Sequence, residues 1–318
     1  MKKILATLSG VLAAAALMAS PLLMAAPTTT IYDNIPSPIP SNVPSVGFEA
    51  TSTSEFGGGF QFASTQRENP TVTVLMSSWA CEDGTWNAAT CATSPGATFN
   101  HPITLKVYEL NADNTVGDLL VEDTQSYEMP YRPSTNLANC PTGGGWYDGT
   151  SCKNGKAFTI SHTFNGVTLP EDAIISVAYN TSHHGYVPIG TSDCSSEPEG
   201  CPYDSLNVGT SPSPTVGTAL PSINDVYQNS TWAGAYCDEN LATGTFRLDS
   251  GCWSGFLPAI EVSASDPIIT PSTKEQCKKD GYKDFTDLDG NAFKNQGQCV
   301  AYVASKGRVV GNFAQLQF

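Results

Sequence analysis

The sequence is poor in basic residues: 15 Lys and Arg stand against 30 Asp and Glu, which gives a formal net charge of −15. The shortage falls on residues 27–271, which hold six basic and 25 acidic residues, whereas residues 272–318 hold seven and five. A surface this acidic repels phosphate groups and anionic lipid headgroups. We therefore expect no nucleic-acid partner, and neutral sugars, cations and uncharged polymers remain as ligand classes.

Motifs that signal a common enzyme class are also missing. The chain has no Gly-x-Ser-x-Gly nucleophile elbow, no His-Glu-x-x-His helix and no phosphate-binding Gly-rich loop that ends in Lys and Ser or Thr. No two cysteines are as close as the Cys-x-x-Cys knuckles of a zinc site require. The sequence thus offers no motif from which a reaction or a zinc site can be deduced.

Long apolar runs are absent after the first residues. Lys2 and Lys3, the mostly apolar residues 4–18 and the small residues up to Ala25 and Ala26 have the layout of a signal peptide. No later run reaches the roughly 20 apolar residues of a membrane-spanning helix. We expect residues 1–26 to be a cleaved signal peptide and the mature protein to be secreted or held at the cell surface, with no membrane span. The oligomeric state does not follow from the sequence.

Ten cysteines are the strongest positive feature, because they fall into five local couples. In an oxidising compartment this layout predicts disulfides rather than free thiols. The simplest connectivity joins neighbours, and each such bond closes a short loop worth about 3 kcal/mol in the chain-entropy model. The predicted pairs are Cys81–Cys91, Cys140–Cys152, Cys194–Cys201, Cys237–Cys252 and Cys277–Cys299.

Alternation of apolar and polar residues predicts many short strands separated by Gly, Pro and Asn turns. The clearest strands lie at residues 71–76, 103–107, 158–164, 175–179 and 260–262. We predict a mainly β fold: an antiparallel jelly-roll-like β-sandwich over residues 27–263. Long inserts interrupt it at 81–91, 133–156, 182–202 and 212–252, and four cysteine couples lie in them, so that disulfides staple loops with little core of their own.

The pattern changes near the C-terminus. Residues 264–272 contain two prolines and are typical of a linker, and residues 273–318 are predicted to form a small module. A capping-box start at Ser272 predicts a helix that ends near Gly281, and a second helix is expected over about 296–305. The Cys277–Cys299 disulfide would then cross-link the two helices and stabilise a module too small for a large core.

Several runs of residues in the first domain carry a resemblance: Ile31–Pro36, Val46–Gly57, Met76–Ala80, His101–Leu105, Pro130–Pro133 and Tyr203–Gly209. Together they resemble an uncharacterised family of exported bacterial β-sandwich proteins over most of residues 30–263. The resemblance implies a secreted sandwich and assigns neither an activity nor catalytic residues.

A second resemblance lies in Cys277–Phe285 and Phe293–Val303, which are similar to a small cysteine-paired module at the C-termini of varied exported bacterial proteins. Tyr282 stands where that module is expected to have Trp. The resemblance implies an accessory or surface-retention role.

Tryptophans in the predicted disulfide loops are the candidate ligand-binding residues. An exposed indole can stack on the apolar face of a sugar ring while nearby polar groups bind hydroxyls. Trp86, Trp146, Tyr147 and Asp148 are the residues that we select for such a site. The alternative is that the indoles pack on the disulfides and form small cores for the loops.

Paired carboxylates and metal ligands complete the candidates. A glycosidase needs two carboxylates at a fixed separation, and Glu49 and Glu55 are the pair to test first. The strongest resemblance to a calcium loop lies in Asp287, Asp289 and Asn291, which also suit an Asp-rich turn. Two acidic pairs are further calcium candidates: Glu82-Asp83 and Asp238-Glu239. Ala292 stands where an EF-hand needs Gly, so we predict no cofactor and keep calcium as the one cofactor to test.

The histidines are weak candidates for a metal site. His101 suits a turn and His162 suits a core position. His183 and His184 are adjacent and would not readily ligate one metal, because neighbouring strand residues face opposite ways.

The sequence therefore supports a secreted or cell-surface binding or structural protein that uses its stapled loops to contact a glycan or a cell-surface partner. The alternative is a secreted carbohydrate-active hydrolase with paired carboxylates.

Overall fold

The computed structural model describes residues 28–86, 88–179, 206–238, 242–266, 269–288 and 290–307. The chain divides into two compact units: a large one over Pro27–Ile268 and a second to which the residues from Ile269 onwards belong. The expected signal peptide, the Cys194–Cys201 couple and His183 and His184 lie outside the described residues. None of the described helices is long and apolar enough to cross a membrane.

The large unit is an antiparallel sandwich of two seven-stranded sheets, as the alternation predicted. The first sheet runs in the order β1-β16-β4-β11-β15, with β9 paired to β4 and β2 paired to β11. Along β4, residues 71–78 pair with β9 on one side, while β16 and then β11 share the other side. Its strands are β1 (Thr28–Asp33), β2 (Ser45–Gly47), β4 (Glu68–Ser78), β9 (Lys156–Thr163), β11 (Leu206–Ser211), β15 (Leu257–Pro258) and β16 (Ile260–Ser265).

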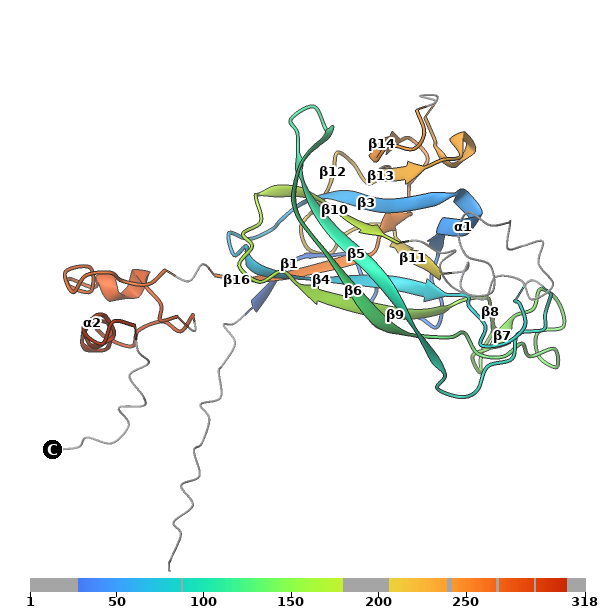
Figure 1. The fold of residues 1–318 in the computed structure, drawn as a ribbon, viewed down its shortest axis with the longest axis horizontal. Coiled ribbons are helices and arrows are strands. Elements are labelled where there is room, and N and C mark those ends of the chain that lie inside the picture. The colour runs from blue at the N-terminus through green and yellow to red at the C-terminus, as the bar shows by residue number, and fades with distance from the viewer. Residues whose placement is uncertain are drawn as a thin grey trace, which may run out of the picture. The chain divides into compact units, whose positions relative to one another are not determined.

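The second sheet runs in the order β14-β13-β3-β10-β5-β6, with β12 also paired to β3. The long β5–β6 hairpin runs diagonally across the sandwich (Figure 1). Its strands are β3 (Thr53–Gln61), β5 (Thr98–Leu110), β6 (Val116–Pro130), β10 (Asp172–Ala178), β12 (Thr218–Leu220), β13 (Asp225–Ser230) and β14 (Arg247–Ser250).

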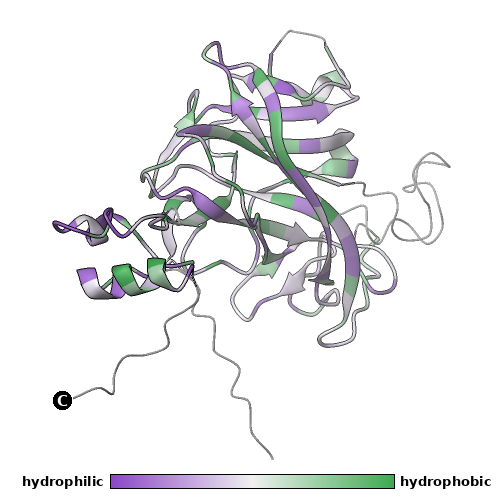
Figure 2. Ribbon diagram, turned by 60° about the vertical axis from the view of Figure 1, so that its left-hand side comes forward, coloured by the Kyte–Doolittle hydropathy of each residue, from purple (hydrophilic) through white to green (hydrophobic). Residues whose placement is uncertain are grey.

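The core of the sandwich lies between the two sheets, and β5 and the first part of β4 contribute every second residue to it. Val72, Val74 and Met76 of β4 and Leu105 and Val107 of β5 are fully buried in one apolar cluster. The strands show this alternation as bands of hydrophobic and hydrophilic residues (Figure 2). Strand β5 leaves alternate side chains exposed or half-buried, and such alternation is the signal that identifies a strand in the sequence, whereas β10 and β11 are buried over consecutive residues.

The two sheets are also linked by side chains at one edge. His162 of β9 lies 3.3 Å from Asp123 of β6, measured from Nε2 to Oδ2. His162 is 6% exposed and its ring lies edge-on to Phe164, with centroids 4.5 Å apart. The core position predicted for His162 is confirmed.

Smaller elements lie in the connections. The two-residue strands β7 (Trp146–Tyr147) and β8 (Cys152–Lys153) form a hairpin of their own. One α-helical turn, α1 (Phe48–Thr51), precedes β3, and a 3₁₀ turn, η3 (Ala233–Ala235), follows β13.

Four of the five predicted disulfides are confirmed. Cys81–Cys91, Cys140–Cys152, Cys237–Cys252 and Cys277–Cys299 are bonded, with Cα–Cα distances of 5.3–5.7 Å. The first three lie in loops of the sandwich, and Cys277–Cys299 lies in the C-terminal unit.

The C-terminal unit contains the expected second helix, α2 (Gln296–Ala304), and a 3₁₀ turn, η4 (Gly281–Asp284). Cys277, Phe293, Cys299 and Tyr302 form its buried cluster. Asn295 caps α2 by accepting a hydrogen bond from the backbone N–H of Gln298 at 2.9 Å.

The helix expected over residues 272–281 is not formed, and successive turns occupy residues 274–280 instead. A capping box is present one residue later than predicted: Gln276 accepts from the backbone N–H of Thr273 at 2.8 Å and donates its own to the Thr273 hydroxyl at 3.4 Å. Lys279 and Asp280 then take left-handed conformations, with φ of 51° and 68°, which ends helical propagation immediately.

Candidate functional site

A hollow of about 610 Å³ opens among the stapled loops of the sandwich, between residues 93–98, 130–136 and the β7 strand. Aromatic and proline side chains supply most of its apolar wall: Tyr131, Trp146, Tyr147, Pro95, Pro130 and Pro133. Polar groups of Thr93, Ser134, Asn136 and Lys156 lie among them. A concave, largely apolar surface with a few polar groups is the usual form of a small-ligand site.

Trp146 and Tyr147 take different positions because adjacent residues of a strand face opposite ways. Trp146 is 9% exposed, and its indole N–H donates to the carbonyl of Gly155 at 2.8 Å. Tyr147 is 37% exposed. Trp146 therefore forms part of the wall with a satisfied N–H, whereas Tyr147 offers ring surface to a ligand.

Tyr131 is the third ring of the hollow. It is half-buried and packs against Phe99 with ring centroids 4.8 Å apart and planes inclined by 43°. Its backbone N–H donates to Ala97, another residue of the wall, at 3.2 Å. Tyr131 is therefore held in place by the sandwich core on one side and by the 93–98 segment on the other.

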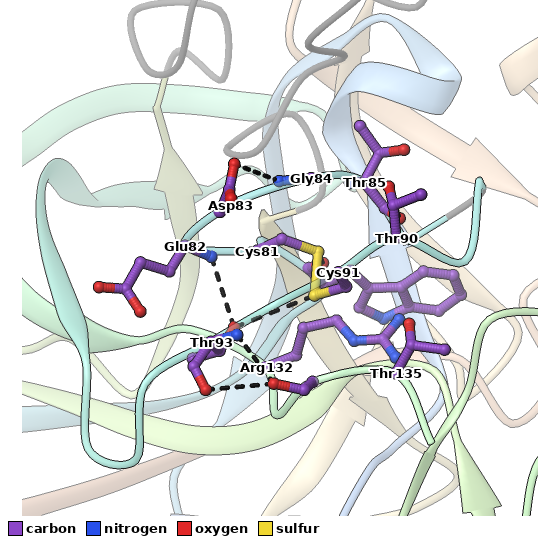
Figure 3. Close-up of a disulfide and its surroundings, with 12 residues drawn as sticks. Cys81, Glu82, Asp83, Gly84, Thr85, Thr90, Cys91, Thr93, Arg132 and Thr135 are labelled. Carbon is purple, nitrogen blue, oxygen red and sulfur yellow. Dashed lines mark hydrogen bonds between the residues drawn. A yellow bond between two sulfur atoms is a disulfide. The ribbon is translucent and has the colours of Figure 1, made fainter. Parts of the chain in front are cut away.

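Arg132 fixes the backbone behind this wall. It is fully buried, its backbone N–H donates to Ala80 at 2.9 Å, and its Nη2 donates to the carbonyl of Gly144 at 2.6 Å. Thr135 donates its hydroxyl to the same carbonyl at 3.1 Å. Arg132 extends beside the Cys81–Cys91 disulfide toward Thr135 (Figure 3). Burial lowers the pKa of Arg132 to about 10, so the side chain stays charged at neutral pH.

The other two residues selected for this site, Trp86 and Asp148, do not line the hollow. Trp86 is half-buried and meets Trp79 edge-on, with centroids 4.8 Å apart. Asp148 accepts from the backbone N–H groups of Ser151 and Thr150, each at 2.8 Å, and lies 3.6 Å from the Lys153 ammonium. The N–H groups of Ser151 and Thr150 hold the pKa of Asp148 at about 2. Both residues therefore stabilise the loops in which they lie.

Glu55 and Glu49 occupy different elements, β3 and α1. Glu55 is 6% exposed, and both of its carboxylate oxygens are engaged. Oε1 accepts from Tyr108 at 2.8 Å and Ser176 at 2.5 Å, and Oε2 lies 3.2 Å from the Lys106 ammonium. Burial, followed by the nearby Glu55, raises the pKa of the Tyr108 hydroxyl. This arrangement surrounds Glu55 with three donors and links three strands of the second sheet.

Two further hollows lie elsewhere on the sandwich. One of about 710 Å³ lies over β5, β6 and the end of β10 and includes Lys106, Glu122 and Asp123. The other, of about 460 Å³, includes Asp113, Asp238 and Arg247. Each contains two carboxylates but, unlike the hollow at the stapled loops, no tryptophan among its lining residues.

The predicted calcium loop forms an Asp-rich turn. Asp287 accepts from the backbone N–H of Asn291 at 2.8 Å and from its side-chain amide at 3.1 and 3.2 Å. Asp289 lies outside the described residues. Across the described ranges, no three His, Cys, Asp or Glu side chains come together as a metal site would require. His101 is buried, 5.5 Å from the ring of Tyr179, where a turn residue was expected.

Tyr131, Lys156 and Trp232 were missed as candidates by the sequence reasoning. Tyr131 stands in the family-like run Pro130–Pro133, so a signal was present, whereas Lys156 has none beyond its place at the start of a strand. Trp232 is 53% exposed and packs against Gly234, where a Cβ atom would come within 2.7 Å of the indole. No family model, curated protein or solved structure matches this chain, so these assignments depend on geometry alone.

Proposed function

We propose that the protein is an exported, non-catalytic sandwich that binds a glycan in the hollow between its first two stapled loops. The observation that carries the proposal is the grouping of Tyr131, Trp146 and Tyr147 in one concave surface with Ser134 and Asn136. Sugar rings have apolar faces and polar edges, and such a surface matches both. Drug-sized and disaccharide-sized ligands fit hollows of a few hundred cubic ångströms.

Rigidity of the wall supports the same proposal. The backbone around the rings is fixed by Arg132, by the Trp146–Gly155 hydrogen bond and by the disulfides Cys81–Cys91 and Cys140–Cys152. A site that is already ordered loses little conformational entropy on binding. The staples would then serve the ligand site as well as the stability of the loops.

A glycan-array screen of the purified mature protein, followed by calorimetry on the best ligands, tests the proposal. We expect Tyr147→Ala to weaken binding about five- to tenfold, because stacking on an aromatic ring contributes roughly 1–1.5 kcal/mol. Tyr282→Ala, which removes a tyrosine from the other unit, is the matched control and should leave the affinity unchanged. Equal affinity of Y147A and the wild type, or no binding to any glycan, would refute the assignment.

The proposal also includes secretion of the protein, a jelly-roll topology for the sandwich and a helical C-terminal module. The confirmed disulfides support an oxidising compartment. The neighbours β1-β16-β4-β9 in one sheet and β3-β10-β5-β6 in the other support a jelly-roll-like winding of two Greek keys. Helix α2 and Cys277–Cys299 support a small helical module, for which we propose a surface-retention role, consistent with the family resemblance.

The hydrolase alternative is less favoured by the contacts of its candidate residues. Glu55 already accepts from Tyr108, Ser176 and Lys106, and a catalytic acid would need to release at least one of them. Release of reducing ends from soluble polysaccharides, lost in Glu55→Gln but retained in Tyr147→Phe, would favour the hydrolase over the binding protein.

A further inference from the structure

The charge of the hollow at the stapled loops differs from that of the rest of the sandwich. Among the described residues that line it, Lys156 alone is charged, whereas the two other hollows each contain two carboxylates. Residues 27–271 hold 25 acidic side chains against six basic ones, and a hollow lined by a lysine and no acid contrasts with the two other hollows described above.

Lys156 also has no ion pair among the described residues. The other lysines of the sandwich are paired, Lys106 with Glu55 and Lys153 with Asp148. Lys156 directly follows Gly155, whose carbonyl holds the indole of Trp146, so the lysine and the aromatic wall share one piece of backbone. Lys156 therefore lines the same hollow as the three rings.

A second positive charge lies behind the wall. Arg132 stands between two lining residues, Tyr131 and Pro133, is fully buried, and makes its side-chain hydrogen bonds to backbone carbonyls rather than to a carboxylate. Two acids outside the lining bond to lining residues: Glu82 accepts from the backbone N–H of Ser94 at 2.6 Å and Glu128 from the hydroxyl of Thr98 at 2.9 Å. A buried charge is screened less than an exposed one, so Arg132 makes the potential of the hollow more positive.

We propose that the hollow selects glycans that carry a single anionic group, with Lys156 as the residue that pairs with it. This inference rests on the proposed glycan site. A polyanion would be repelled by the acidic surface around the hollow, whereas one charge on an otherwise neutral oligosaccharide meets Lys156 alone. Carboxylate sugars and sulfated sugars are two sources of the same chemistry.

The test is a set of matched probes on one array: neutral oligosaccharides, each beside its sialylated, its uronic-acid and its sulfated derivative. We expect the wild type to prefer at least one acidic derivative over its neutral parent by about five- to tenfold, as a partly desolvated ion pair provides. Preference for sialylated and uronic-acid members identifies carboxylate as the source, and preference for sulfated members identifies sulfate. Ionic strength raised from about 0.05 M to about 0.5 M should erode the preference.

Lys156→Gln should remove the preference and leave binding of the neutral parents in place. Arg67→Gln is the matched control. Lys156 pairs with Ser78 at one end of β4, and Arg67 directly precedes the other end, about 35 Å away along the strand. Arg67→Gln removes the same charge and should keep the preference. Equal binding of acidic and neutral members by the wild type, or a preference that survives in K156Q, overturns the inference while the glycan site stands. Failure of every member to bind overturns both.

Discussion

The interior of the sandwich and its stapled loops are stabilised by different kinds of side chain. Between the sheets the buried residues are almost all apolar, as at Leu105 and Val107. Beside the disulfides the central buried side chains are polar: Arg132, just after β6, near Cys81–Cys91, and Asp249, in β14, near Cys237–Cys252. Strands satisfy their backbone groups in ladders and leave their side chains free to be apolar, whereas loops have no ladder and need side chains to pair their N–H and C=O groups.

Arg132 and Asp249 pair opposite kinds of backbone group: Arg132 donates to C=O groups, and Asp249 accepts from N–H groups. Arg132 donates to the carbonyls of Gly144 and Pro133. Asp249 accepts from backbone N–H groups and from side-chain donors, all within 3.1 Å: Cys237, Asp238, Gln228 and Trp253. A disulfide restricts the ends of each loop. Arg132 then fixes Gly144 inside the Cys140–Cys152 loop, and Asp249 fixes the backbone of Cys237 and Asp238 at the start of the Cys237–Cys252 loop. The predictions below separate these contributions.

The largest effect is expected for Leu105→Ala in the core. Leu105 is fully buried in β5, and its truncation removes apolar contacts and leaves a cavity between the sheets. We expect the free energy of unfolding to fall by about 3–4 kcal/mol, measured by urea denaturation with the disulfides intact. Leu120→Ala, at a residue 40% exposed, is the control and should change stability by less than about 0.5 kcal/mol.

Asp249→Ala should destabilise the protein nearly as much, by about 3 kcal/mol, although it removes little apolar surface. The substitution leaves the N–H groups of Cys237 and Asp238 and the side-chain donors of Gln228 and Trp253 without their buried acceptor. Asp118→Ala deletes an exposed carboxylate and serves as the control. If both variants unfold at the same urea concentration, Asp249 does not organise its loop.

The core could be predicted from the sequence and the loop centres could not, for a physical reason. Alternation in residues 103–107 is local, because a strand displays its burial pattern in its own residues. Asp249 gains its role from partners up to 21 residues away, and Arg132 from Gly144, 12 residues away, in segments without periodicity. Among the residues of the site, Trp146 and Tyr147 were selected from the sequence because they lie in a predicted disulfide loop. Lys156 lies in a separate strand, and only the folded structure shows that it lines the same hollow.

Disulfide pairing was predictable because neighbouring couples close short loops, and Cys194–Cys201 stays a prediction that peptide mapping under non-reducing conditions can check. The prediction of a helix over residues 272–281 was wrong for a different reason. Its capping box does form at Thr273, but Lys279 and Asp280 adopt positive φ, which propensity does not reveal for residues other than glycine.

Arg132→Met should cost less than Asp249→Ala, about 1–2 kcal/mol. Loss of the hydrogen bond to Gly144 is partly offset, because methionine removes a buried charge whose Nη1 has no hydrogen-bond partner among the described residues. The same urea experiment measures it, with Arg67→Met as the control at a half-buried position. A loss of 3 kcal/mol or more would show that the guanidinium is as central to its loop as Asp249 is to the other.

The smallest effect concerns Asp148, which orders the turn inside the Cys140–Cys152 loop. Its folded-state pKa of about 2 lies below the ordinary value of 3.8, so its contribution to stability is complete above pH 3.8 and is lost as the pH falls toward 2. Asp148→Asn keeps an acceptor for the N–H groups of Ser151 and Thr150 but loses the charge opposite Lys153. We expect the wild type to melt slightly above D148N at pH 6 and most of that difference to be lost at pH 2. A difference in melting temperature that stays constant over this range would mean that the carboxylate charge adds nothing and that the disulfide with the backbone hydrogen bonds alone orders the turn.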